Sequence, residues 1–274
     1  MSQLELLRQQ EMVFVKLIED AGAKIMAIYH GDDFEVQMKG ANDPLTKADL
    51  AANQIIVEGL KILCPIIPIL SEESINTFSD GERPALYWAV DPLDGTKEFI
   101  KRNGEFTVNL ALIENGIPIF GIVMAPALEV IYRGWAGYGA WKKSSKSPNW
   151  EEISASKLSS INENNPLRVV GSRSHADPKM ALWLERYQPH QLIGVGSSLK
   201  FCMVAEGVAD IYPRHGTTFI WDTAAGHAVL AAVGGDVFQL DGELLTYTEP
   251  AQTKNASFVA LASKKMFFDF QPFE

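Results

Sequence analysis

Two aspartates that follow an apolar run are the residues of this sequence best suited to chemistry. Asp91 and Asp94 lie in the segment W-A-V-D-P-L-D-G-T, with Pro92 between them. Because proline restricts the backbone, both carboxylates can converge on neighbouring divalent ions, and the Leu93 carbonyl supplies another oxygen. Hard oxygen donors favour Mg²⁺, Mn²⁺ or Ca²⁺ over zinc. The segment predicts a cation site, although the same residues also suit a solvated turn.

The two residues after this turn offer a way to hold an anion. Gly95 and Thr96 begin a segment whose backbone N–H groups can bind a phosphate. The sequence contains neither a C-x₅-R phosphate loop nor a D-x-D-x-T motif, so no covalent phosphoenzyme is needed. The pattern indicates direct attack of water on a phosphate group held by metal ions.

Three more acids stand at positions where elements begin or end. Glu72 follows the apolar run I-I-P-I-L, Asp222 precedes the helix-like T-A-A-G-H-A-V-L, and Asp49 lies three residues after Thr46. Each has an ordinary explanation when taken singly. Glu72 suits a loop, Asp222 suits a helix N-cap, and Asp49 completes a capping box with Thr46.

Helices and an antiparallel sheet are expected to position these acids in the first half of the chain. Apolar residues recur at helical spacing over 4–28, and a second helix is predicted from Thr46 until Pro65. From residue 85 the pattern changes to strands, with a hairpin around the turn Asn115-Gly116.

The second half has a different pattern. Residues 142–165 are rich in Lys, Ser, Asn and Pro without strong periodicity, which predicts a linker. Strand ends near 167–175 and 209–214, separated by helical segments, predict an α/β arrangement. We therefore expect an N-terminal α+β part over 1–150, with the metal-binding motifs, and a C-terminal α/β part over 151–274, with substrate-binding residues and the last metal ligand.

Composition and charge limit the partners. The chain has 274 residues, 47% of them hydrophobic, and a formal net charge of −10, so no nucleic acid polymer is expected as a partner. Charged residues interrupt residues 1–29, which predicts neither a signal peptide nor a membrane span and places the protein in the cytoplasm. Cys64 and Cys202 lie in apolar surroundings without C-x-x-C spacing, as expected of reduced, buried thiols.

Four ordered motifs resemble those of the inositol monophosphatase superfamily. These are T-x-x-D at 46–49, S-E-E-S at 71–74, D-P-L-D-G-T at 91–96 and W-D-T-A-A-G at 221–226. The resemblance implies an α/β fold, a layered αβαβα sandwich like that of fructose-1,6-bisphosphatase.

The match is closer to the bisphosphate nucleotidase branch of that family. It rests on D-G-T-K-E-F-I-x-R-N-G-E-F-T-V-N at 94–109, S-R-S-H at 172–175, S-S-L-K-F at 197–201 and A-E-G-x-A-D-I-Y-P-R at 205–214. One departure is Ile220, where members of this branch often carry a polar residue before the W-D pair. This leaves the metal site untouched and affects the fine substrate preference.

The resemblance implies a Mg²⁺-dependent phosphomonoesterase that hydrolyses adenosine 3',5'-bisphosphate to AMP and phosphate, and also the sulfated adenylate. Two or three Mg²⁺ ions would bind, with Mn²⁺ as a substitute and with inhibition by Li⁺. Their ligands would be Glu72, Asp91, Leu93, Asp94 and Asp222. Thr96, hydrogen-bonded to Asp49, would orient the attacking water, since a hydroxyl accepts only when its own proton is donated elsewhere.

The resemblance also assigns the substrate contacts. They are Glu72, Leu93, Asp94, Gly95, Thr96, Ser172, His175, Gly196, Lys200 and Asp222. Without the resemblance, His175 reads as a surface loop residue and Lys200 as part of a solvated helix face. Arg173 stays unassigned.

Two alternatives to this function stay open. An inositol or sugar monophosphatase would share the metal site with a different pocket. A catalytically inactive regulator would bind metal and nucleotide without turnover. The expected partner is a small anionic nucleotide, and the protein is expected to be a monomer or a homodimer.

Overall fold

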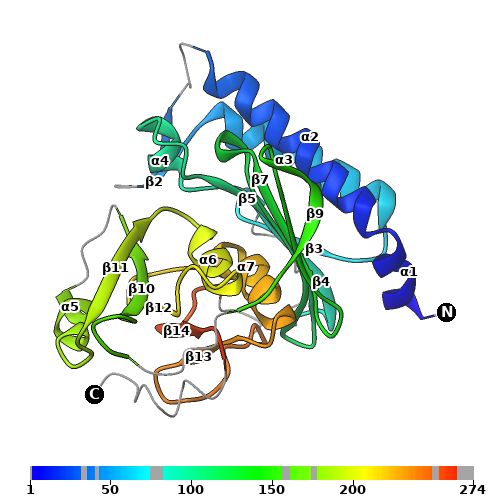
Figure 1. Cartoon of the computed structure of the whole chain (residues 1–274). Coiled ribbons are helices and arrows are strands. Elements are labelled where there is room, and N and C mark those ends of the chain that lie inside the picture. Colours follow the sequence, from blue (N-terminus) through cyan, green and yellow to red (C-terminus); the bar gives the residue numbers. More distant parts are fainter. Residues whose placement is uncertain are drawn as a thin grey trace.

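Two long helices form the outer layer of the N-terminal half. The computed structural model of the chain describes residues 2–31, 36–40, 43–74, 83–155, 161–173, 178–248 and 253–263. After the short α1 (Gln3–Gln9), α2 (Glu11–Tyr29) and α3 (Lys47–Leu63) lie side by side on one sheet. They cover it with apolar side chains such as Phe14 and Ile56, both fully buried, as helical spacing predicts (Figure 1).

The sheet under these helices has seven strands in the order β3-β4-β5-β6-β7-β8-β9. The strands are β3 (Ile69–Ser71), β4 (Leu86–Asp94), β5 (Thr107–Glu114), β6 (Ile117–Ala125), β7 (Val130–Trp135), β8 (Gly139–Ser144) and β9 (Ser147–Ile153). Strand β3 runs parallel to β4, and all other pairs are antiparallel. The predicted hairpin turn is confirmed, because Asn115 and Gly116 both have positive φ, as a tight turn between β5 and β6 requires.

Smaller elements complete this half. They are the pair β1 (Gln37–Gly40) and β2 (Asp43–Leu45), the helix α4 (Thr96–Ile100) and the 3₁₀ turn η2 (Pro126–Leu128).

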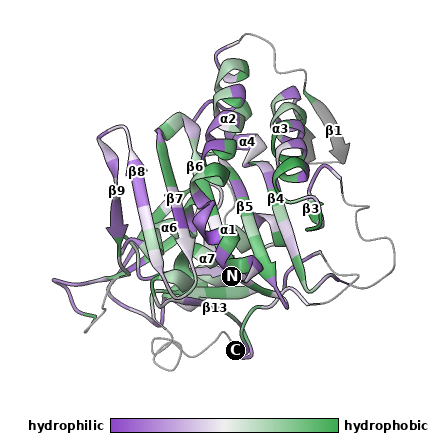
Figure 2. Cartoon of the chain, turned by 90° about the vertical axis from the view of Figure 1, so that its right-hand side faces the viewer, coloured by the Kyte–Doolittle hydropathy of each residue, from purple (hydrophilic) through white to green (hydrophobic). Residues whose placement is uncertain are grey.

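The linker predicted over 142–165 is wrong for its first part. Residues up to Ile153 continue the sheet as the end of β8 and as β9, so the predicted boundary at 150/151 falls inside a strand. These two strands are mainly hydrophilic, in contrast to β4 and β6 (Figure 2). Their weak periodicity arises because β9 forms the sheet edge and β8 lies next to it, where packing demands few apolar side chains. Residues 156–160 lie outside the described residues.

The C-terminal half builds a second, mixed sheet in the order β11-β10-β12-β14-β13. Its strands are β10 (Leu167–Ser172), β11 (His190–Val195), β12 (Ile211–Arg214), β13 (Asp236–Gln239) and β14 (Phe258–Leu261). Helix α5 (Pro178–Leu184) lies outside this sheet, while α6 (Leu199–Ala205) and α7 (Ile220–Ala232) lie between the two sheets (Figure 1). The order of layers is helix, sheet, helix, sheet, helix, which confirms the expected α/β layered fold.

Helix α7 packs against strands of both sheets, with most of its residues buried. A side chain at Gly121 of β6 would place its Cβ 2.2 Å from the Ala225 carbonyl oxygen, so only glycine allows this approach. The cores of the two halves are therefore joined through this helix.

Both cysteines are free and buried, as predicted. Among the described residues, no helix combines the length and the apolar character needed to cross a lipid bilayer.

Candidate active site

A cavity of about 480 Å³ opens where the ends of β4, β10 and β12 meet the beginning of α7. All but two of the predicted site residues line it. These are Glu72, Asp91, Leu93, Asp94, Gly95, Thr96, Ser172, Gly196, Lys200 and Asp222. Asp49 lies behind Thr96, and His175 lies outside the described residues.

Strands β3 and β4 bring the first three acids together. The parallel strands end side by side, and the Glu72 N–H donates to the Val90 carbonyl, next to Asp91. In a regular strand, Asp91 and Asp94 would face opposite sides because side chains alternate. The pairing of β4 with β5 shifts between these two residues, and both carboxylates line the same cavity. The irregularity at Pro92 and Leu93 thus lets both carboxylates face the same cavity.

Helix α7 carries the fourth acid, Asp222, which is about 130 residues away from Asp91 and Asp94 in the sequence. Asp222 lies in its first turn, and its Oδ2 accepts a hydrogen bond from the Phe219 backbone N–H at 2.8 Å. The N-cap role suggested by the sequence is wrong for Asp222, because the N-cap is Phe219 and Asp222 is the third residue of the helix. The same carboxylate also lines the cavity.

The acids repel one another in this position. Burial is the main cause that raises the pKa of Asp91 well above 3.8, and the charges of Glu72, Asp94 and Asp222 raise it further. Burial and the charge of Asp94 likewise raise the pKa of Asp222. A cation would relieve this repulsion, and carboxylate and carbonyl oxygens are the donors that hard cations prefer.

The acids do not yet form a closed cage. In the described ranges, no three acidic, histidine or cysteine side chains lie close enough together to hold an ion as they stand. The chemistry of the donors, carboxylates and a backbone carbonyl, fits a hard cation.

Asp49 and Thr96 meet in the way that the sequence predicts. The Thr96 hydroxyl is 3.3 Å from Asp49 Oδ1 and 3.4 Å from the Leu93 carbonyl oxygen, to either of which it can donate. The other carboxylate oxygen of Asp49 accepts from the Thr46 N–H and hydroxyl at 2.8 and 2.6 Å. Burial raises the pKa of Asp49, whereas these two bonds lower it. The predicted capping box is confirmed, and the same acid contacts the cavity through Thr96.

Two cations, Lys200 and Arg214, also line the cavity. Lys200 on α6 is 5% exposed and lies near Asp94, and burial lowers its pKa to about 8. Its ammonium donates to the carbonyl oxygens of Ser197 and Val195. The alternative of a solvated helix face is therefore wrong for Lys200.

The second cation, Arg214, was missed from the sequence. It ends β12, and its Nε is buried without a hydrogen-bond partner in the described part of the chain. Strands β10, β11 and β12 are parallel, so Ser172, Gly196 and Arg214 gather at their carboxyl ends, where ligands bind in such sheets. The sequence signal that could have identified Arg214 was its place at the predicted strand end near 209–214.

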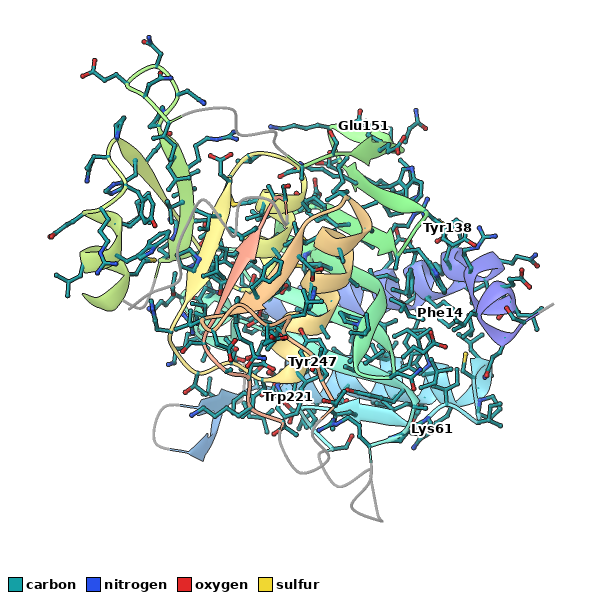
Figure 3. The ribbon with its side chains drawn as sticks, turned by 90° about the horizontal axis from the view of Figure 1, so that it is seen from below. Phe14, Lys61, Tyr138, Glu151, Trp221 and Tyr247 are labelled. Carbon is teal, nitrogen blue, oxygen red and sulfur yellow. The ribbon has the colours of Figure 1, made fainter. Side chains whose placement is uncertain are left out.

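An aromatic pair also lines the cavity. The rings of Phe219 and Trp221 stack with centroids 5.1 Å apart and planes inclined by 11°. Ile220, which lies between these two residues in the sequence, is buried and does not line this cavity. It lines a separate small pocket instead. Trp221 and Tyr247, both labelled in Figure 3, lie at the start of α7, where the Tyr247 hydroxyl donates to Thr223 at 3.0 Å. The departure at Ile220 therefore removes no side chain from the cavity wall.

Comparison with known proteins agrees with this geometry. The family model described as "Inositol monophosphatase family" matches residues 7–265. The chain belongs to the inositol monophosphatase family. It is 48% identical to a 3'(2'),5'-bisphosphate nucleotidase CysQ of Shigella flexneri over 244 residues, which cover 89% of this chain and 96% of the relative.

Solved structures of this family share the fold. A CysQ from Bacteroides thetaiotaomicron superposes with a TM-score of 0.78 at 35% identity and covers 92% of this chain and 97% of its own. A Thermotoga maritima IMPase gives a TM-score of 0.74 at 26% identity, with 96% and 94% covered. The predicted resemblance to the family and to its bisphosphate nucleotidase branch is confirmed.

Proposed function

We propose that this chain is a Mg²⁺-dependent phosphatase that hydrolyses adenosine 3',5'-bisphosphate to AMP and phosphate. One observation carries the proposal: a single cavity combines a wall of carboxylates with two cations, the buried Lys200 and the partly buried Arg214. The relatives named as bisphosphate nucleotidases support the choice of substrate.

A substrate with two phosphates matches both parts of this cavity. The 3'-phosphate would lie at Glu72, Asp91, Asp94 and Asp222, where only a cation allows an anion to approach the acids. The 5'-phosphate, which the product keeps, would lie at Lys200 and Arg214. The stacked rings of Phe219 and Trp221 offer a flat apolar surface for the base.

The protein's own contribution is to hold the metal and to orient water. Glu72, Asp91, Asp94, Asp222 and the Leu93 carbonyl would hold Mg²⁺, which supplies positive charge at the phosphoryl oxygens when bound. Thr96 donates a hydrogen bond to Asp49 or to the Leu93 carbonyl, so its oxygen is left to accept a hydrogen bond from a water molecule. The site then favours direct attack of that water in line with the leaving 3'-oxygen.

Phosphate release from a small substrate panel tests the proposal. The panel contains adenosine 3',5'-bisphosphate, its 5'-sulfated analogue and inositol 1-phosphate, each with Mg²⁺ and with EDTA. We expect release from the nucleotides only with Mg²⁺, and a kcat/KM for inositol 1-phosphate lower by at least about 100-fold. Asp91→Asn is the inactive control.

Other outcomes separate the alternatives. Preference for inositol 1-phosphate would make the protein an inositol monophosphatase. Nucleotide binding without phosphate release would make it a regulator, and either result overturns the proposal.

A further inference from the structure

One part of the segment over 94–109 has no role in the site described so far. Thr107 and Asn109 share one face at the beginning of β5, and Glu105 lies two residues before the strand. Thr107 and Asn109 are almost completely buried, although both are polar. Buried polar groups need partners, and these residues find theirs in the second half of the chain.

Glu105 binds the loop between β11 and α6 with both carboxylate oxygens. Oε2 accepts from the Gly196 backbone N–H at 2.9 Å, and Oε1 pairs with the Arg173 guanidinium at 2.7 Å. The same guanidinium donates to the Gly194 carbonyl at 2.8 Å. Arg173, left unassigned from the sequence, thus has a partner inside the protein, and Glu105 holds the end of β11 from two sides.

Thr107 and Asn109 bind the next residues of that loop. The Thr107 and Ser198 hydroxyls are 2.8 Å apart, and the Ser198 hydroxyl donates to Asn109 Oδ1 at 2.7 Å. The backbone N–H of Ser198 also donates to Asp94. Ser198 immediately precedes α6, which carries Lys200. The loop is therefore held at Gly196 by Glu105 and at Ser198 by Thr107 and Asn109.

The two segments are also in close steric contact. A Cβ at Gly196 would lie 2.7 Å from the Glu105 carbonyl oxygen and 2.9 Å from Glu98 Cγ. On the other side, a Cβ at Gly95, where φ is +89°, would lie 3.3 Å from the same carbonyl oxygen. The backbone of Glu105 is thus wedged between the turn that begins α4 and the loop that begins α6.

We propose that Glu105 is a positioning residue that sets the distance between the metal side of the cavity and the subsite for the second phosphate. It holds Gly196 and, through the loop, Lys200 at a fixed place relative to Asp94. The inference rests on the proposed function, because it assigns the second phosphate to Lys200. It makes Glu105 a determinant of specificity for substrates with two phosphates, without contact to the substrate.

The experiment compares adenosine 3',5'-bisphosphate with adenosine 3'-monophosphate, which lacks the second phosphate. For Glu105→Ala we expect KM for the bisphosphate to rise about 10-fold, with kcat and KM for the monophosphate within about 2-fold of the wild type. Glu105→Gln keeps an oxygen for the Gly196 N–H and should recover part of the affinity. Arg173→Ala removes the ion pair and the bond to the Gly194 carbonyl but keeps the bond between Glu105 and Gly196, so it should have a smaller effect than Glu105→Ala.

Glu114→Gln is the matched control, because it removes the carboxylate of the last residue of β5, at the end of the strand away from Glu105. Melting temperatures of all variants report whether they fold. Equal losses on both substrates, or wild-type KM values in folded Glu105→Ala, would overturn the inference. A wild-type protein that releases phosphate from neither nucleotide would instead overturn the proposed function.

Discussion

At the scale of single residues, a hydroxyl gains its role from the acid beside it. The Thr96 oxygen is oriented to accept a hydrogen bond from water when its own proton points elsewhere, and Asp49 Oδ1 lies 3.3 Å away. Asp49 is held in place by two further bonds from Thr46, so its orientation does not depend on Thr96. The pair is thus arranged before any substrate binds.

Asp49→Asn and Thr96→Ala should lower kcat by about 10²-fold or more, because both remove the acceptor for the water proton. Mg²⁺ affinity, measured by calorimetry, should change less than about 2-fold. Thr96→Ser keeps the hydroxyl and serves as the control. Asp49→Asn also weakens the helix cap by about 1 kcal/mol, so its melting temperature must be recorded. Full activity in either variant would show that this pair does not orient the water.

At the scale of elements, the position of α7 decides where Asp222 lies. The helix touches β6 and β7 through glycines: a Cβ at Gly121 would come within 2.2 Å of the Ala225 backbone, and one at Gly134 within 2.8 Å of Val229 Cα. Backbone atoms cannot move aside as flexible side chains do. The helix can lie this close to the sheet only because neither Gly121 nor Gly134 has a side chain.

Gly121→Ala should move α7 away from the sheet and destabilise the protein by about 1 to 3 kcal/mol, the usual range for overpacking a core. Because Asp222 moves with the helix, Mg²⁺ affinity should fall as well. Denaturant unfolding and metal titration measure the two effects. Gly194→Ala is the control, since a Cβ there meets nothing closer than 3.8 Å. A variant that loses stability but keeps its metal affinity would separate the helix position from the site.

At the scale of the whole molecule, the buried acids make stability depend on pH and metal. Burial raises the pKa values of Asp49, Asp91, Asp94 and Asp222 above the ordinary 3.8. Over the range between 3.8 and the raised values, the folded state keeps protons that the unfolded chain has lost. The free energy of unfolding of the metal-free protein therefore falls as pH rises through this range.

In EDTA, the melting temperature should be lower at about pH 7.5 than at about pH 5.5, because these acids lose their protons in the folded state. Added Mg²⁺ should raise it more at the higher pH, since metal binds the deprotonated carboxylates. Asp91→Asn should weaken both effects. An equal gain from Mg²⁺ at the two pH values would contradict a metal site made of these acids.

Much of the site could be predicted from the sequence because its parts are local. The capping box at Thr46, the tight turn at Asn115-Gly116 and the strand that contains Asp91 depend on residues within a few positions of one another. Such patterns are visible in any window of the chain. The family resemblance rests on the same short motifs, which is why the fold class was predicted correctly.

The tertiary structure alone decided which distant residues meet. Nothing near Glu105 in sequence indicates that it binds Gly196 and Arg173. Strand ends were predicted near Ser172 and Arg214, but only the structure shows that β12 lies beside β10. The edge strand β9 and the end of its neighbour β8 were mistaken for a linker because partly exposed strands need few apolar residues. Local physics fixes turns, caps and strand ends, whereas contacts between segments far apart in the sequence depend on how the two sheets pack around α7.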